Sequence, residues 1–141
     1  MINPVSHADS ADAIATYKVE PYVVAADVYA VAPHTGRGGW TWYTGSAGWL
    51  YRLIVESLLG VELAIDRLRF SPCVPAEWKE FRLDYRFRES VYHVTVSRAD
   101  TGGRACAVWL DGVPQADNGV ALSNDGNEHE VRVLLPVSPV A

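Results

Sequence analysis

The pattern of apolar and polar positions along the chain changes near Gly60. Before Gly60, apolar residues recur at helical spacing among small residues, a pattern typical of α-helices. The expected helices are Ala11–Tyr17, Pro21–Ala30 and Ser46–Leu59. Asp9 or Ser10 can cap the first helix, and Pro21 suits the first turn of the second.

The second and third predicted helices differ in their apolar faces. The second is apolar on all sides, which predicts burial between other helices. The third has one broad apolar face that would pack on a helical core, formed by Trp49, Leu50, Leu53, Ile54 and Leu58. Gly60 is placed to end this helix as its C′ residue.

After Gly60 the apolar period shifts toward two, which predicts short β-strands. Leu63–Phe70 is expected to form a hairpin that turns at Asp66 and Arg67, and Phe81–Phe87 to pair with Val91–Ser97. Asp111-Gly112 is a strong hairpin signal, and alternating apolar residues follow at Val131–Leu135. The expected fold class is therefore α+β, with N-terminal helices followed by a small antiparallel β-sandwich.

Composition narrows the class of protein. The chain has 141 residues, of which 49% are hydrophobic, so a packed core is feasible. Its net charge of −5 argues against nucleic-acid binding. No apolar run approaches the roughly twenty residues that span a bilayer, and the first residues lack signal-peptide features, so we expect a cytoplasmic location.

Cysteine and histidine residues give no metal or redox motif. Cys73 and Cys106 lack metal-ligand spacing, and the sequence leaves open whether they pair. His7, His93 and His129 are scattered, so no metal site and no organic cofactor are expected.

The segment Gly36–Trp49 combines five glycines with three tryptophans. Clustered glycines allow close backbone approach, and aromatic rings with a polar edge suit sugar rings as well as cores. Gly45 follows a hydroxyl residue at an expected helix start, where free N–H groups favour an anion. Sugar and phosphate are therefore the ligands that this segment indicates.

Four stretches of the chain carry a family resemblance: Ile2–Pro4, Tyr17–Tyr29, Gly36–Trp49, and Phe70–Pro75 with Trp78. They resemble the C-terminal region of cyclic β-1,2-glucan synthases and family 94 glycoside phosphorylases. Such enzymes cleave a β-glucosidic bond with inorganic phosphate and invert the anomeric centre. The resemblance implies that residues 1–60 are the last helices of an (α/α)6 catalytic barrel and residues 61–141 a C-terminal β-domain. A parent protein of this kind can be associated with the inner membrane.

The resemblance also implies roles for individual residues. Thr44 and Gly45 match the pair that contacts phosphate in the family. Asp27 stands near where some members place a sugar-binding glutamine. The general-acid aspartate, and an arginine and a histidine that bind phosphate, lie upstream of the matched segments in the family. No catalytic residue is therefore assigned to this chain, and activity of the isolated chain is not expected.

Four further residues are candidate sugar or anion contacts. Arg37 could reach an anion or form a structural pair, and Trp40 and Trp42 could stack on sugars or pack between helices. Glu20 could bind a sugar hydroxyl or be tied to a helix end.

Two functions remain open at this point. The first is a C-terminal part of a β-glucan-processing phosphorylase or glycosyltransferase, with a β-glucan or glucooligosaccharide, inorganic phosphate or a sugar 1-phosphate, and an upstream polypeptide completing the barrel as partners. The alternative is a carbohydrate-binding or structural β-sandwich module. Its glycan face would use aromatic residues of the β-half, although their period-two spacing favours core packing: Phe81, Tyr85, Phe87, Tyr92 and Trp109.

Overall fold

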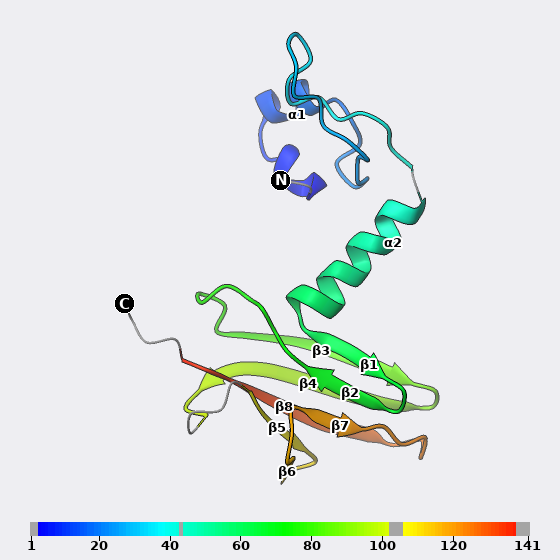
Figure 1. Ribbon diagram of the computed structural model, residues 1–141, viewed down its shortest axis with the longest axis vertical. Coiled ribbons are helices and arrows are strands. Elements are labelled where there is room, and N and C mark those ends of the chain that lie inside the picture. The colour runs from blue at the N-terminus through cyan, green and yellow to red at the C-terminus, as the bar shows by residue number, and fades with distance from the viewer. Residues whose placement is uncertain (1–2, 43, 102–105, 138–141) are drawn as a thin grey trace. The chain divides into compact units, whose positions relative to one another are not determined.

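The computed structural model describes residues 3–42, 44–101 and 106–137. The chain divides into two compact units, Met1–Arg52 and Leu53–Ala141 (Figure 1). The described helices all lie before Gly60, and the strands of the sheets begin at Val61. This order confirms the predicted α+β class. The domain boundary expected at Gly60 stays a prediction.

The first unit contains a 3-10 turn η1 (Pro4–His7) and the helices α1 (Ala11–Tyr17) and α2 (Thr44–Arg52). The bounds of α1 are as predicted, and the Ser10 hydroxyl caps it by accepting a hydrogen bond from the Ala13 N–H at 3.2 Å. The helix ends at Lys18, which adopts the left-handed conformation with φ 57°.

The helix predicted at Pro21–Ala30 is wrong. These residues form turns and irregular backbone, and Val28 makes an isolated antiparallel β-bridge with Gly38. Their apolar residues include several valines, whose β-branched side chains have weak helix propensity, and the glycine segment offers the backbone other partners. The expected burial fails as well, because Val23 is buried while Tyr22 and Tyr29 are exposed.

The third predicted helix is present, but it changes from an α-helix to a π-helix. It begins as α2 at Thr44 and continues from Leu53 to Leu58 as a π-helical segment, η2. In the first unit the predicted apolar face is covered only in part: Leu50 is half-buried, whereas Trp49 is 71% exposed, with the Arg52 guanidinium 5.6 Å above its ring. The prediction that Trp49 packs in a helical core is therefore wrong within the described residues.

The second unit is a β-sandwich of two sheets (Figure 1). The three-stranded sheet has the order β1-β2-β7, and the five-stranded sheet has the order β3-β4-β8-β5-β6. The strands of the first sheet are β1 (Val61–Ala64), β2 (Arg67–Phe70) and β7 (Gly119–Ala121). Those of the second are β3 (Glu80–Phe87), β4 (Ser90–Ala99), β8 (Glu128–Pro136), β5 (Ala107–Leu110) and β6 (Val113–Pro114).

The buried faces of both sheets meet in one hydrophobic core. Leu68 and Phe70 of β2 are fully buried with Tyr92, Val94 and Val96 of β4, because alternate side chains of a strand share one face. Val55 and Leu59, from the end of the helical stretch, also pack against this core.

The predicted hairpins and the sandwich are confirmed, except that the first hairpin turns at Ile65 and Asp66, because Arg67 already pairs with Ala64 as the first residue of β2. The structure also has two features that were not predicted. β4 pairs with β8 in parallel, so the larger sheet is antiparallel except at that pair. β7 has only three residues and was not predicted. The turn at Asp111-Gly112 has φ values of 49° and 80°, as a type I′ turn requires.

Gly60 fixes the passage from the helical stretch into the sandwich. Its φ is +65°, and a Cβ placed there would lie 2.1 Å from the backbone carbon of Ser71. The Gly60 carbonyl accepts a hydrogen bond from the Ser71 N–H at 2.7 Å. Glycine is required here by both conformation and space.

Candidate functional site

Two segments of the first unit, residues 26–29 and 37–40, lie side by side, and the second of them contains the predicted site residues Arg37 and Trp40. The Ala26 N–H donates to the Trp40 carbonyl at 2.8 Å, and the Tyr29 N–H donates to the Arg37 carbonyl at 2.9 Å. A Cβ on Gly39 would lie 2.4 Å from the Asp27 carboxylate, so glycine allows this approach. The clustered glycines therefore serve backbone pairing within the chain.

Asp27 has a structural role in this arrangement. Its Oδ1 accepts a hydrogen bond from the Trp40 N–H at 3.2 Å, and its own carbonyl accepts one from the Gly39 N–H at 2.9 Å. Asp27 thus joins the two segments through both its side chain and its backbone.

Glu20 and Trp42 meet directly. The Trp42 indole Nε1 donates a hydrogen bond to Glu20 Oε1 at 3.2 Å, and the Tyr22 ring lies edge-on to Trp42 with a centroid distance of 6.3 Å. Trp42 is 66% exposed and has φ 64°, a conformation uncommon for a non-glycine residue. The Glu20 carboxylate thus orients an exposed indole ring, and no spacing pattern predicts this contact between residues 22 positions apart.

Arg37 and Trp40 line one open hollow of about 440 Å³. We call it the aromatic hollow; its other lining residues include Tyr29, His34 and Thr41. Trp40 is 71% exposed, so it is not packed between helices in this unit. Tyr29 and His34 were not assigned to the site from the sequence; their rings are in edge-on contact at 6.0 Å.

Thr44 and Gly45 are the first two residues of α2. A Cβ on Gly45 would meet no atom within 4 Å, so the space beside this backbone is open. The first N–H groups of a helix have no partner within the helix and favour an anion. The phosphate contacts that the resemblance implies for Thr44 and Gly45 stay a prediction.

The aromatic residues of the β-sandwich do not form a glycan face. Phe81, Tyr85 and Phe87 pack against the core, and Tyr92 is fully buried. Trp109 is half-buried and lies beneath the Arg132 guanidinium at 4.6 Å from its ring centroid. Core packing, the other explanation for this alternation, accounts for four of the five.

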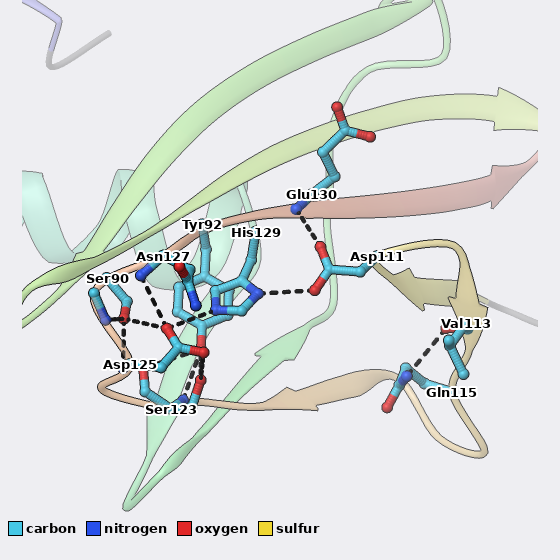
Figure 2. A network of polar contacts seen from close by, with 11 residues as sticks. Ser90, Tyr92, Asp111, Val113, Gln115, Ser123, Asp125, Asn127, His129 and Glu130 are labelled. Carbon is cyan, nitrogen blue, oxygen red and sulfur yellow. Dashed lines mark hydrogen bonds and ion pairs between the residues drawn. The ribbon is translucent and has the colours of Figure 1, made fainter.

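A polar network joins the ends of several sandwich strands (Figure 2). His129 Nδ1 lies 2.8 Å from Asp111 Oδ2, and its Nε2 lies 3.2 Å from Asp125 Oδ1. The ring stacks on Tyr92 at 4.7 Å. Because ionised carboxylates only accept hydrogen bonds, both ring nitrogens must donate, which requires the imidazolium form.

The pKa values in this network follow from these contacts. The hydrogen bond to Asp111 raises the pKa of His129, and the same bond lowers the pKa of Asp111. The Asn127 N–H holds the pKa of Asp125 well below its usual range. On the outer face of the sheet, the hydrogen bond to Asp84 likewise raises the pKa of His93.

Ser90 completes the network but is not a nucleophile. It is 0% exposed, its hydroxyl donates to Asp125 Oδ1 at 2.9 Å, and its oxygen accepts from the N–H groups of Asp125 and Gly126. A catalytic serine would donate to its general base and face substrate. The network is therefore structural, and sequence reasoning had no local signal for it because its members are far apart along the chain.

The two cysteines are free thiols. Cys73 is exposed, whereas burial raises the pKa of the Cys106 thiol to about 11. Neither thiol has a feature of a reactive cysteine.

The order of a helical segment followed by a β-sandwich agrees with the family models that the sequence matches. Residues 1–60 match the glycosyl hydrolase 94 superfamily, catalytic domain, and residues 62–102 match the glycosyl hydrolase family 65, C-terminal domain. These matches confirm the predicted resemblance to family 94.

Relatives of known function agree with this assignment. The chain is 50% identical over 103 residues to the cyclic beta-(1,2)-glucan synthase NdvB of Rhizobium meliloti (strain 1021), covering 73% of this chain and 4% of that protein. It is 30% identical over 101 residues to the N,N'-diacetylchitobiose phosphorylase of Vibrio furnissii, covering 71% and 12%. It is also 30% identical over 118 residues to the solabiose phosphorylase of Paenibacillus borealis, covering 81% and 15%. The chain thus spans a small part of each relative's length.

The described helices are all too short or too polar to cross a membrane.

Proposed function

We propose that this chain forms the C-terminal part of a β-glucan-processing glycoside phosphorylase or glycosyltransferase of family 94. The observation that carries the proposal is the 50% identity to the cyclic beta-(1,2)-glucan synthase over 103 residues. The phosphorylases among the relatives support phosphate as the nucleophile or product group.

In this proposal Thr44 and Gly45 bind the phosphate. A threonine hydroxyl and the N–H groups at the start of α2 suit a dianion, and the open space beside Gly45 lets an oxygen approach the backbone. Glu20, Arg37, Trp40 and Trp42 contact the saccharide, with Trp42 oriented by its hydrogen bond to Glu20.

The chemical step requires a group that this chain does not supply. In an inverting phosphorolysis a general acid protonates the leaving glycosidic oxygen while phosphate attacks the opposite face of the sugar. We propose that an upstream catalytic segment provides this acid and the remaining phosphate ligands. This chain then contributes one wall of the site and is inactive alone.

The test is phosphate-dependent release of glucose 1-phosphate from β-1,2-glucooligosaccharides. The chain is assayed alone and after mixing with the catalytic domain of a family 94 relative from which the matching segment has been removed. We expect activity only in the mixture. Activity of the chain alone, or none in either case with both polypeptides folded, contradicts the proposal.

A further inference from the structure

A second hollow of about 260 Å³ lies beside the aromatic hollow. Arg37 and His34 line both hollows, so the two share a wall. The other residues that line the second hollow include Lys18, Thr16 and Thr35. We call it the basic hollow, because its lining holds a lysine, an arginine and a histidine and no carboxylate.

The cations of the basic hollow have no acidic partner. Within the described part of the chain, no Asp or Glu oxygen lies within ion-pair distance of Lys18 or Arg37. By contrast, Arg67 and Arg82 pair with Asp117 and Glu80. The positive charges of Lys18 and Arg37 line one hollow and therefore favour an anion between them, although the chain as a whole has a net charge of −5.

Backbone contacts fix the positions from which these cationic side chains project. Lys18 is fixed in the left-handed conformation at the end of α1, and the Gly38 N–H donates to the neighbouring Tyr17 carbonyl at 2.9 Å. Gly36, with φ +86°, brings the loop so close to α1 that a Cβ would lie 2.9 Å from Thr16 Cγ2. The Thr16 hydroxyl already donates to the Asp12 carbonyl, so Lys18, Arg37, His34 and Thr35 supply the donors.

We propose that the two hollows together bind an anionic saccharide, a sugar unit that carries a phosphoryl or carboxylate group. The sugar ring stacks on the exposed faces of Trp40 and Tyr29 in the aromatic hollow. The anionic group enters the basic hollow, where Lys18 and Arg37 form charge-assisted hydrogen bonds. This subsite rests on the proposed function in that it shares Arg37 and Trp40 with the saccharide contacts, but its anion site uses Lys18 and not Thr44 and Gly45.

The test is a ¹H–¹⁵N NMR titration of the 141-residue chain at constant ionic strength. The probes are glucose 6-phosphate, glucuronate, neutral glucose and inorganic phosphate. We expect an anionic sugar to bind more tightly than glucose or phosphate and to shift amides near Lys18, Arg37 and Trp40. The first two probes distinguish a phosphoryl group from a carboxylate.

Four variants check the assignment. Lys18→Gln should weaken binding of the anionic sugar about tenfold, the worth of one charge-assisted hydrogen bond, and leave glucose binding unchanged. Lys18→Asn, which suits the left-handed backbone, should do the same if Lys18→Gln fails to fold. Trp40→Ala should weaken sugar binding but not phosphate binding. Lys79→Gln alters the only other lysine of the chain and should change nothing.

Two results would overturn the subsite. One is an unchanged affinity for both anionic sugars in the Lys18 variants. The other is binding that disappears in Thr44→Val but persists in Lys18→Gln, which would assign the anion to the proposed phosphate site instead.

Discussion

At the scale of single residues, the described polar side chains mostly hold backbone in place. Asp27 ties Trp40 to the paired segment, Glu20 orients Trp42, and Ser90 ties the 125–126 turn to β4. In the glycine-rich region these contacts leave aromatic rings exposed, whereas in the sandwich the polar groups are satisfied internally. The first unit therefore presents exposed aromatic rings, as the proposed saccharide site requires, and the sandwich buries its polar network.

His129 should make the stability of the sandwich depend on pH. A histidine whose folded-state pKa is raised contributes stability that is fully present below its unfolded value of about 6.5 and is lost as the pH rises through the folded pKa. The lowered pKa values of Asp111 and Asp125 contribute stability above about pH 4 that is lost as the pH falls. Urea unfolding between pH 5 and pH 9 measures the alkaline loss.

The variant His129→Gln should remove most of that alkaline loss. His93→Gln is the comparison, because His93 also lies between two carboxylates but its side chain is 43% exposed, against 13% for His129. Solvent screens exposed pairs, so this variant should change the pH dependence less. An equal effect of both variants would contradict the role given to His129.

Ser90→Ala should destabilise the sandwich by about 1–3 kcal/mol, because it leaves two backbone N–H groups without their acceptor. Ser97→Ala is a matched control on the same strand, at a half-buried position on the opposite face. Thermal unfolding followed by circular dichroism compares the two variants. A loss in Ser90→Ala no greater than in Ser97→Ala would show that the buried hydroxyl is dispensable.

At the scale of elements, the sequence predicted those with a strong local signal. α1 has a capping serine, the β5–β6 turn has Asp111-Gly112, and β3 and β4 alternate cleanly. The prediction of a helix at Pro21–Ala30 was wrong. Its apolar residues do not form a single helical face, and its backbone forms hydrogen bonds with residues 36–40 instead of within a helix. β7 is too short for a pattern, and the parallel pairing of β4 with β8 is a long-range contact.

Gly60→Ala should destabilise the chain by about 2 kcal/mol or more. A Cβ there would clash with the Ser71 backbone, and the residue would need a left-handed conformation. Gly48→Ala is the control: it lies within α2, a Cβ there meets nothing within 4 Å, and it should stabilise the helix by up to about 1 kcal/mol. Urea unfolding separates the two; similar effects would contradict the account of Gly60.

At the scale of the whole molecule, the candidate site could be predicted only in part. Thr44, Gly45 and the tryptophans stood out by residue type and family resemblance. The contact between Glu20 and Trp42 and the shared wall of the two hollows required the fold, since they join residues far apart in the sequence. The exposed aromatic rings of the first unit agree with one wall of a site that a further catalytic segment completes.

The measurement that tests this account most directly is the phosphate dependence of the reconstituted enzyme. Thr44→Val is compared with Thr95→Val, the same substitution on the outer face of β4. We predict that Thr44→Val lowers kcat/KM for phosphate about 10- to 100-fold, as expected for loss of one hydrogen bond to a charged ligand. Thr95→Val should leave it unchanged. Equal values for the two variants would contradict the claim that this chain carries part of the phosphate site.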